Sequence, residues 1–327
     1  MAPDNNLGTV IITGVSGLVG GRIAAYLVKQ GHKVIGTTRN PDGAHVDAIT
    51  GATGAVITDL DTVLADVHTC GPTAIIHCAG PAAAACADDP EAAINHRIEM
   101  MRRLITVSAQ TGAKLCVLST ANLYAPPLHG AVGVTAPIDD TQSAYAASHN
   151  AAERLLCNAA ANLPIAPLIL RLGNLYGAPV SAMADCWHLL AQHACRSAME
   201  TGSVHLRDAG TSYRSYTPIA ALETVLPAIL APKEGGSCTI SNFAPAAPIF
   251  AGKLVAEIQA IMESVYDKKI QLNFDPSTID DGAASFWYGD NLEQDAPRAV
   301  NNLAALHAFE LRNLLAFCHN NYRVTVT

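Results

Sequence analysis

The chain has 327 residues, half of them hydrophobic and 15% charged, which leaves enough apolar side chains for a large buried core. The formal net charge is −8, and no run of basic residues offers a surface to nucleic acid, so a DNA- or RNA-binding protein is not expected. No apolar run reaches the roughly 18 residues that a membrane span requires. Residues 1–6 lack the basic and apolar regions of a signal peptide.

The nine cysteines are scattered along the chain and form no Cys-x-x-Cys pair. Some lie in apolar runs, as Cys116 does between Leu115 and Val117, which is typical of reduced thiols in a core. We therefore expect a cytoplasmic protein without a metal site.

Short β-branched runs alternate with longer helical stretches over the first half of the chain. Strands are predicted at 10–12, 33–37, 55–57, 74–76, 115–118 and 165–170, and helices at 18–30, 91–110 and 143–161. Apolar strands bounded by glycine and separated by helices favour a parallel sheet covered on both faces. Right-handed crossovers then give an α/β fold with a doubly wound parallel sheet of the Rossmann type.

The pattern changes after Gly177. Helices are predicted at 184–199, 218–230, 248–266 and 303–319, with short strands near Val204 and Ser212. We therefore predict a dinucleotide-binding domain over residues 1–177 and a smaller, mixed substrate-binding domain over residues 178–327. Some of the later segments are expected to interleave with the sheet.

A glycine-rich turn joins the first strand to the first helix. Residues 13–20 read TGVSGLVG, and a dinucleotide-binding turn requires this context of a preceding strand and a following helix. Gly14 permits the tight turn, Gly17 lets the backbone approach a pyrophosphate, and Gly20 lets helix and strand pack closely. The free N–H groups at the start of the helix would face the phosphates. The turn therefore predicts a nicotinamide dinucleotide as ligand.

The end of the second strand bears on the choice between NAD and NADP. An NAD-selective site places Asp or Glu there for the ribose 2′-hydroxyl, but Thr38 holds this position and Arg39 follows it. A guanidinium suits a 2′-phosphate, so NADP is favoured and NAD is the alternative. Asp59 and Leu60 follow the third strand and are candidates for contact with the adenine, with an ordinary solvated loop as the competing interpretation.

Further segments follow the glycine turn in a recognisable order: IHCAG at 76–80, Asn95, LST at 118–120, YAASH at 145–149 and RLGNLYG at 171–177. Together they resemble the extended short-chain dehydrogenases/reductases, the NAD-dependent epimerase/dehydratase group that includes UDP-galactose 4-epimerase. The turn TRNP at 38–41 is more similar to the NADP-using dihydroflavonol reductase branch. The resemblance covers nearly the whole chain and is strongest from residue 9 to residue 178. It also implies a homodimer.

The resemblance implies a catalytic site built from Ser or Thr, Tyr and Lys. Thr120 would hydrogen-bond the substrate oxygen, and Tyr145 would donate or accept a proton as hydride moves at the neighbouring carbon. The family's lysine is expected four residues after Tyr145, where this chain has His149. The helical period still puts residue 149 beside residue 145. Imidazole, however, is shorter than a lysine side chain and mostly neutral near pH 7.

Three outcomes of this replacement stay open. His149 still serves a redox reaction, with or without the help of a water molecule. The protein performs a different chemistry in the same pocket, with a structural or transient cofactor. Alternatively, it is a non-catalytic binding or regulatory relative.

Two neighbouring segments narrow the chemistry that the resemblance implies. Sugar-nucleotide 4,6-dehydratases place an acid directly after the hydroxyl residue, whereas Ala121 and Asn122 follow Thr120 here, which argues against a dehydratase. Asn95 matches a helix Asn near the ribose, although Ile98 and Glu99 stand where Gly and Thr are expected. An asparagine on the helix surface is the alternative.

Asn174 and Arg214 match positions that touch the diphosphate of a nucleotide sugar in the family. Arginine is a suitable bidentate donor to phosphate. The aspartate expected after the Arg214 segment is missing from residues 217–221, which weakens the interpretation as a nucleotide-sugar enzyme. A turn cap at Asn174 and a structural ion pair at Arg214 are the alternatives.

The sequence thus favours an NADP-preferring oxidoreductase that interconverts a ketone and an alcohol on a polar small molecule, with a sugar-nucleotide 4-epimerase as the alternative. The residues assigned to the cofactor are Gly14, Ser16, Gly17, Leu18, Val19, Gly20, Arg39, Asp59, Leu60, Cys78, Ala79, Gly80, Asn95, Tyr145 and His149.

Overall fold

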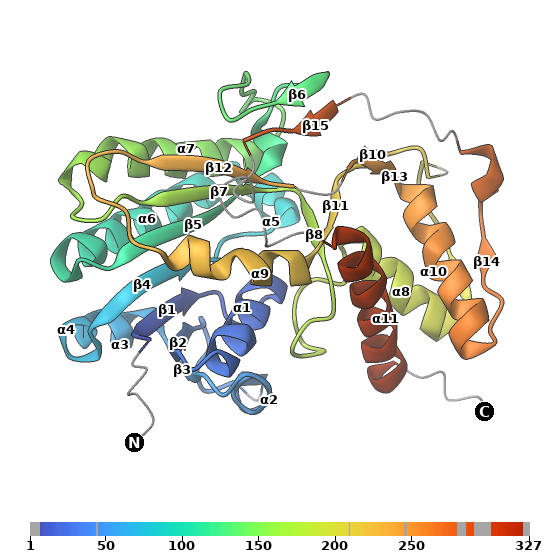
Figure 1. Cartoon of the computed structure of the whole chain (residues 1–327), viewed down its shortest axis with the longest axis horizontal. Coiled ribbons are helices and arrows are strands. Elements are labelled where there is room, and N and C mark those ends of the chain that lie inside the picture. Colours follow the sequence, from blue (N-terminus) through green and yellow to red (C-terminus); the bar gives the residue numbers. More distant parts are fainter. Residues whose placement is uncertain are drawn as a thin grey trace.

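The computed structural model describes residues 7–43, 45–208, 210–244, 247–279, 286–290 and 302–322. A seven-stranded sheet lies at its centre, in the order β12-β7-β5-β4-β1-β2-β3 (Figure 1), and every neighbouring pair is parallel. The strands are β1 (Thr9–Thr13), β2 (Lys33–Thr37), β3 (Val56–Thr58), β4 (Pro72–His77), β5 (Lys114–Thr120), β7 (Leu168–Leu172) and β12 (Thr239–Phe243). The predicted doubly wound α/β sheet is therefore confirmed.

Helices cover both faces of this sheet, because successive side chains of a strand point to opposite faces. Val10 and Ile12 share one core with α1 (Leu18–Lys29), α2 (His45–Thr53) and α9 (Ile219–Leu230). Ile11 shares the other core with α3 (Leu60–Ala65), α4 (Val67–Cys70), α6 (Pro90–Thr111) and α7 (Ala144–Ala159). The strands read as continuous apolar runs because both of their faces are buried.

A smaller cluster of helices stands beside the sheet, to the right in Figure 1. It packs α8 (Leu190–Thr201), α10 (Ala251–Tyr266) and α11 (Leu303–Asn321) around a third apolar core. The other strands form four short pairs outside the central sheet: β8 (Asn174–Tyr176) with β11 (Tyr216–Pro218), β9 (Ser203–Val204) with β14 (Gln271–Leu272), β10 (Tyr213–Arg214) with β13 (Ile249–Phe250), and β6 (Gly130–Val132) with β15 (Phe286–Tyr288). The remaining elements are α5 (Ala83–Asp88), η1 (Ala121–Leu123), η2 (Ala160–Asn162) and η3 (Pro276–Thr278).

Two elements from the second half of the chain belong to the central layers. The helix α9 packs on the sheet, and β12 forms its edge next to β7. The strand β12 was not predicted because it contains the polar residues Ser241 and Asn242. Both are buried, and the Asn242 amide is satisfied by donating to the carbonyls of Val132 and Gly289. The domain boundary after Gly177 stays a prediction.

The helix predicted over 184–199 begins later, at Leu190, so this prediction is wrong by about one and a half turns. Local hydrogen bonds hold the preceding segment in turns. Ser181 Oγ accepts from the N–H of Met183, and the Trp187 indole donates to the carbonyl of Ala182. Such bonds compete with the helical pattern. The helix α2 was also not predicted.

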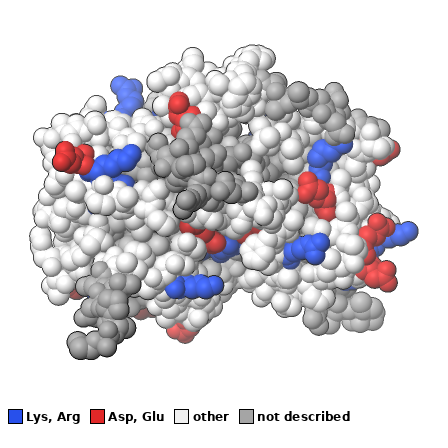
Figure 2. Space-filling model, in the orientation of Figure 1, with Lys and Arg blue, Asp and Glu red and all other residues white. Residues whose placement is uncertain are grey.

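Charged side chains are few and scattered on the face of the molecule shown in Figure 2. All nine cysteines are free, and none of them is exposed. Within the part of the chain that the structure describes, no helix is both long and apolar enough to cross a bilayer.

Candidate active site

The glycine turn sits at the carboxyl end of β1, between β2 and β4. Gly14 has a φ of +75°, a backbone conformation that favours glycine, and a Cβ there would lie 2.9 Å from the Cα of Ala79. A Cβ on Gly20 would overlap the carbonyl of Gly14. The predicted roles of Gly14 in the turn and of Gly20 in close packing therefore agree with the geometry.

The start of α1 is suited to an anionic ligand. Gly17 is its N-cap residue and provides no side-chain cap, and the first turn holds no acidic residue. The first N–H groups of a helix have no intrahelical partner and carry its positive dipole end. They open into a cavity of about 550 Å³, which is a typical size for a small-molecule site. This cradle fits the phosphates of a dinucleotide.

The cavity runs along the carboxyl ends of β1, β4, β5 and β7, where the strand order of the sheet reverses. Ligands of open α/β sheets bind at such a switch point. Of the predicted site residues, those that line it are Gly14, Gly17, Leu18, Val19, Gly20, Cys78, Ala79, Gly80, Thr120, Tyr145, His149, Asn174 and Arg214. The structure therefore brings the predicted cofactor, catalytic and substrate residues to one place.

Tyr145 lies in the first turn of α7, which begins where Ser143 caps the helix by accepting from the N–H of Ala146. Burial raises the pKa of the Tyr145 phenol above its ordinary value of 10, and the nearby Arg97 guanidinium opposes this effect. Tyr145 is therefore protonated near pH 7 and suited to donate a proton. Thr120, the second predicted catalytic residue, is buried at the end of β5.

His149 follows one turn after Tyr145, and the two ring centroids are 4.6 Å apart. Burial holds the pKa of His149 well below its usual value, and the charge of Arg97 lowers it further. The imidazole is therefore neutral. Its Nδ1 lies 3.4 Å from Ser119 Oγ, and its buried Nε2 has no hydrogen-bond partner among the residues that the structure describes.

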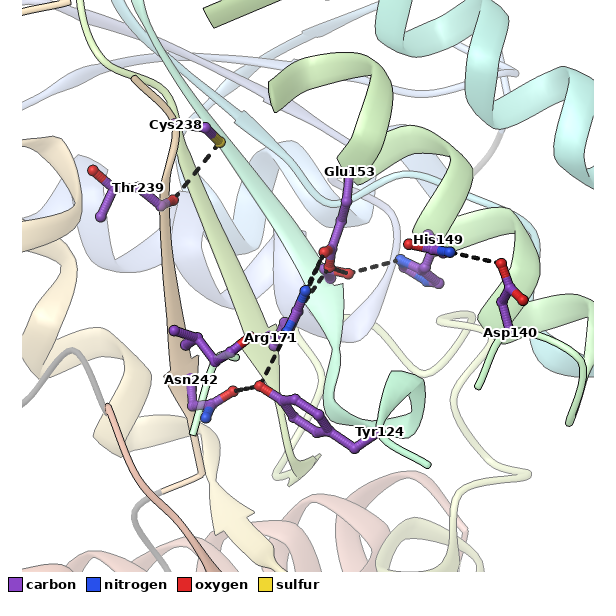
Figure 3. A network of polar contacts seen from close by, with 11 residues as sticks. Tyr124, Asp140, His149, Glu153, Arg171, Cys238, Thr239 and Asn242 are labelled. Carbon is purple, nitrogen blue, oxygen red and sulfur yellow. Dashed lines mark hydrogen bonds and ion pairs between the residues drawn. The ribbon is translucent and has the colours of Figure 1, made fainter. Parts of the chain in front are cut away.

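A buried polar network lies behind His149 (Figure 3). Ser119 Oγ donates to Glu153 Oε1 at 2.5 Å, and Arg171 Nη2 donates to Glu153 Oε2 at 2.7 Å. Arg171 also donates to the hydroxyl of Tyr124, which in turn donates to Asn242 Oδ1. The network therefore joins α7 to β5, β7 and β12 through an ion pair between Glu153 and Arg171.

This network fixes the tautomer of His149. A serine hydroxyl has one proton to give, and Ser119 gives it to Glu153, so Ser119 can only accept from His149. Nδ1 therefore carries the imidazole proton, and Nε2 is left as an acceptor. A lysine at this position would only donate hydrogen bonds, whereas His149 offers the cavity an acceptor, Nε2.

Arg97, on α6, lines the cavity although the sequence analysis did not select it. Its side chain is buried, with Nε donating to Ser148 Oγ at 2.9 Å and Nη2 to the carbonyl of Pro81 at 3.1 Å. The periodic burial of α6 at Ala93, Arg97 and Met101 is the signal that could have identified it.

The same periodicity corrects the prediction for Asn95. Two residues before Arg97, Asn95 is exposed on the outer side of α6 and does not line the cavity. Consecutive helix positions are about 100° apart, so residues 95 and 97 point in nearly opposite directions. Asn95 therefore lies on the helix surface, which is the alternative that the sequence left open.

Four other residues assigned to the cofactor lie outside the cavity lining: Ser16, Arg39, Asp59 and Leu60. Asp59 caps α3 by accepting from the N–H and the hydroxyl of Thr62, and these bonds lower its pKa. Leu60 packs against the core beneath α6. Arg39 is exposed at the end of β2. Their contacts with a cofactor stay predictions.

The far end of the cavity is the predicted substrate side. Asn174 and Arg214 line it, and Arg214 donates to the carbonyl of Tyr213. No carboxylate among the described residues forms an ion pair with Arg214, so the structural ion pair is not observed. Asp185, His188 and Gln192 also line the cavity, and the sequence missed them because it assigned 184–199 to a regular helix.

Comparison with known proteins decides the family. The model of the NAD dependent epimerase/dehydratase family matches residues 10–230. The chain belongs to this family. The match spans the glycine turn, Thr120, Tyr145 and Arg214. The residues predicted for the cofactor, for catalysis and for the substrate side of the cavity therefore all have members within the match.

No protein with a curated description matches this family member. Solved structures are similar over nearly the whole chain. UDP-glucose-4-epimerase from Stenotrophomonas maltophila, with bound NAD and formylated UDP-arabinopyranose, is 18% identical, with a TM-score of 0.73 over 96% of this chain and 98% of that one. The NAD dependent NDP-hexosamine 5,6-dehydratase TunA is 17% identical, with a TM-score of 0.74 over 96% and 98%. UDP-glucuronic acid 4-epimerase from Bacillus cereus, with UDP-glucuronic acid and NAD, is 18% identical, with a TM-score of 0.70 over 96% and 100%. At these identities the likeness establishes the epimerase/dehydratase fold.

Proposed function

We propose that the protein catalyses the dinucleotide-dependent interconversion of a ketone and an alcohol on a polar small molecule. The observation that carries this proposal is the convergence of the glycine turn, Thr120 and Tyr145 on one cavity. The uncapped start of α1 provides donors for the dinucleotide phosphates, and Thr120 and Tyr145 in the cavity lining provide hydroxyl groups for an oxygen of the substrate.

The bound nicotinamide would supply the hydride in the reducing direction or take it up in the oxidising one. Tyr145 donates its phenolic proton to the carbonyl oxygen during reduction, and Thr120 holds that oxygen by a hydrogen bond. The tyrosinate that results regains a proton from solvent. In the oxidising direction the proton of the alcohol moves to tyrosinate. His149 Nε2 would accept a hydrogen bond from a hydroxyl group bound in the cavity, such as one of the cofactor ribose.

A sugar-nucleotide 4-epimerase is the second candidate function, because two of the similar structures are 4-epimerases with bound nucleotide sugars. Arg214 at the far end of the cavity would serve as a diphosphate donor. A dehydratase is disfavoured by the lining. Among the described residues that line the cavity, Asp185 is the single carboxylate, and its side chain is 91% exposed.

The identity of the dinucleotide is part of the proposal. The similar structures hold NAD, but neither of the two residues directly after β2 is an Asp or Glu that could bind the ribose 2′-hydroxyl. Thr38 and the exposed Arg39 stand there instead. We therefore propose NADP as the preferred cofactor, with NAD as the alternative. The free thiols support a reducing compartment, so we place the reaction in the cytoplasm, and a homodimer is the assembly to test.

Turnover assays test the proposed function. A reductase consumes NADPH or NADH in proportion to the alcohol formed from a panel of ketones and keto-sugar nucleotides. An epimerase interconverts UDP-glucose and UDP-galactose with no net consumption. For either reaction, Tyr145→Phe is expected to lower kcat by about 10²- to 10⁴-fold, with the dinucleotide Kd unchanged.

Two results would contradict the proposal. Full activity in Tyr145→Phe would remove Tyr145 as the proton donor. A sharp gain of activity on simple ketones in His149→Lys would indicate that the native site serves a chemistry other than redox.

A further inference from the structure

Arg97 is a buried cation beside the proposed proton donor. Its Cζ lies 5.5 Å from the centroid of the Tyr145 ring, and the residue is 6% exposed. A hypothetical Cβ on Gly80 would overlap the guanidinium, so this glycine leaves the space that Arg97 occupies. The cation is therefore packed between the end of β4 and the catalytic helix, at the wall of the cavity.

The position of Arg97 is tied to the backbone that carries Tyr145. Ser148 Oγ accepts from Arg97 Nε at 2.9 Å and donates to the carbonyl of Tyr145 at 2.9 Å. On its other side, Arg97 Nη2 donates to the carbonyl of Pro81. The guanidinium is thus held from α7 and from the segment after β4, in one place relative to the phenol.

The charge of Arg97 is not neutralised by an acid. No carboxylate in the described part of the chain lies within ion-pair distance of it, and its side chain interacts with the Ser148 hydroxyl, the Pro81 carbonyl and the Cys86 thiol. A buried charge without an opposite charge is costly. An anion that forms nearby is therefore stabilised, and the ionised phenol of Tyr145 is the nearest one that the proposed reaction produces.

His149 does not provide this charge. Arg97 and His77 both disfavour its protonation, and its ring is already desolvated, so it is a neutral acceptor. The groups that act on Tyr145 from the neighbouring elements are Arg97 from α6, Cys86 from α5 and the His149 ring from α7. Arg97 is the cation among them.

We propose that Arg97 takes over the electrostatic task expected of a lysine at position 149, by stabilising the ionised form of Tyr145 from the opposite helix. The inference rests on the proposed function in assigning the proton transfer to Tyr145. It makes Arg97 a positioning residue that acts through the tyrosine. The tasks of the lysine are then divided between two helices. Arg97 on α6 provides the charge, and His149 on α7 provides a hydrogen-bond acceptor.

The sign of the effect follows from the charge. A cation close to a phenol favours tyrosinate, so loss of Arg97 raises the pKa of Tyr145. Oxidation of an alcohol requires tyrosinate, so its rate rises with pH towards that pKa. The rise is therefore expected at higher pH in Arg97→Met than in the wild-type protein, whereas Arg97→Lys keeps the charge and stays near wild type.

The first experiment reads the phenol without turnover. Tyrosinate absorbance is recorded within milliseconds of a jump to alkaline pH, before unfolding, and the Tyr145→Phe trace is subtracted. Arg97→Met is compared with Arg97→Lys and with Arg102→Met, a matched control on the exposed side of the same helix. The hydroxide concentration at the midpoint of the absorbance change is expected to be about tenfold higher, or more, in Arg97→Met alone. An unchanged midpoint would overturn the inference.

The second experiment transfers the charge. In the oxidising direction, Arg97→Met is expected to lower kcat about tenfold or more near neutral pH, and the double variant Arg97→Met/His149→Lys is expected to recover at least part of the loss. Dinucleotide Kd and circular dichroism verify that each variant is folded. If Arg97→Met turns over with the pH profile of Arg102→Met, the inference fails and the proposed function stands. If neither the wild-type protein nor any variant turns over, but the absorbance midpoint shifts in Arg97→Met, the proposed function fails and the action of Arg97 on Tyr145 stands.

Discussion

This protein differs from the pattern of its family at single residues of the cavity. Tyr145 and Thr120 could be predicted from the sequence because their places in the motifs match the family, and both line the cavity. The role of residue 149 could not be predicted in the same way. Its tautomer depends on Ser119 and Glu153, and its charge depends on burial and on Arg97. These are tertiary contacts, and the spacing of residues along the chain does not show them.

The neutral state of His149 predicts a pH dependence of stability. Folding lowers the pKa of His149 well below 6.5 and that of His77 to about 3. An unfolded chain protonates both near pH 6.5, so stability is fully present above that pH and is lost as the pH falls below it. Each histidine contributes a slope of up to about 1.4 kcal/mol per pH unit.

Urea unfolding at pH 7.5, 6.5 and 5.0 measures this slope. His149→Gln is expected to lose about 2 kcal/mol less than the wild type between pH 6.5 and 5.0. The exposed His129 provides the matched control, His129→Gln, which keeps the wild-type slope. Equal slopes in all three proteins would mean that His149 is not held neutral by the fold.

At the scale of secondary-structure elements, the junction of β1, the glycine turn and α1 was the most predictable part of the molecule. Its function depends on backbone geometry, which the spacing of Gly14, Gly17 and Gly20 encodes directly. The strand β12 was unpredictable for the opposite reason. Its polar residues are tolerated in the sheet only because distant loops supply the partners of Asn242.

Gly17→Asp separates stability from binding at this junction. Gly17 has a φ of −83°, so it needs no special backbone freedom, and a Cβ there would meet only the Gly14 carbonyl at 3.4 Å. Asp is a favoured N-cap residue, so the thermal midpoint is expected to stay the same or to rise. The added negative charge repels phosphate, so dinucleotide Kd is expected to rise at least about tenfold, equivalent to about 1.4 kcal/mol.

Calorimetric titration and thermal unfolding check this variant. Gly51→Asp on α2, where a Cβ would meet nothing within 4 Å, adds the same charge away from the cavity and should bind as the wild type does. Undiminished binding by Gly17→Asp would show that the start of α1 does not hold the phosphates.

The ion pair between Glu153 and Arg171 connects the catalytic helix to the sheet. Both side chains are at most 5% exposed, and Arg171 would remain as an unpaired buried charge in Glu153→Gln. Loss of one partner of a buried pair costs about 3–5 kcal/mol. Glu200→Gln breaks the more exposed pair with Arg196 and is expected to cost less than about 1 kcal/mol. Similar losses in the two variants, measured by denaturant unfolding, would contradict this role of the network.

On the scale of the whole molecule, the chain does not divide simply into two halves. The alternation of strands and helices predicted the sheet up to β7, but α9 and β12 return to it from the second half. The cavity is formed where the two halves meet, with the glycine turn and Tyr145 from the first and Arg214 and Gln192 from the second. Such long-range returns depend on packing, so the sequence predicted the kind of site better than its complete lining.

Calorimetric titration with NADPH and NADH measures whether this cavity binds a nicotinamide dinucleotide. We expect saturable binding with a Kd below about 1 mM, a free energy stronger than about −4 kcal/mol. We also expect tighter binding of NADPH, with about a tenfold loss in Arg39→Ala that NADH does not share. Tighter binding of NADH would reverse the proposed cofactor preference. Failure of both dinucleotides to bind at 1 mM would contradict dinucleotide binding in this cavity and, with it, the proposed function.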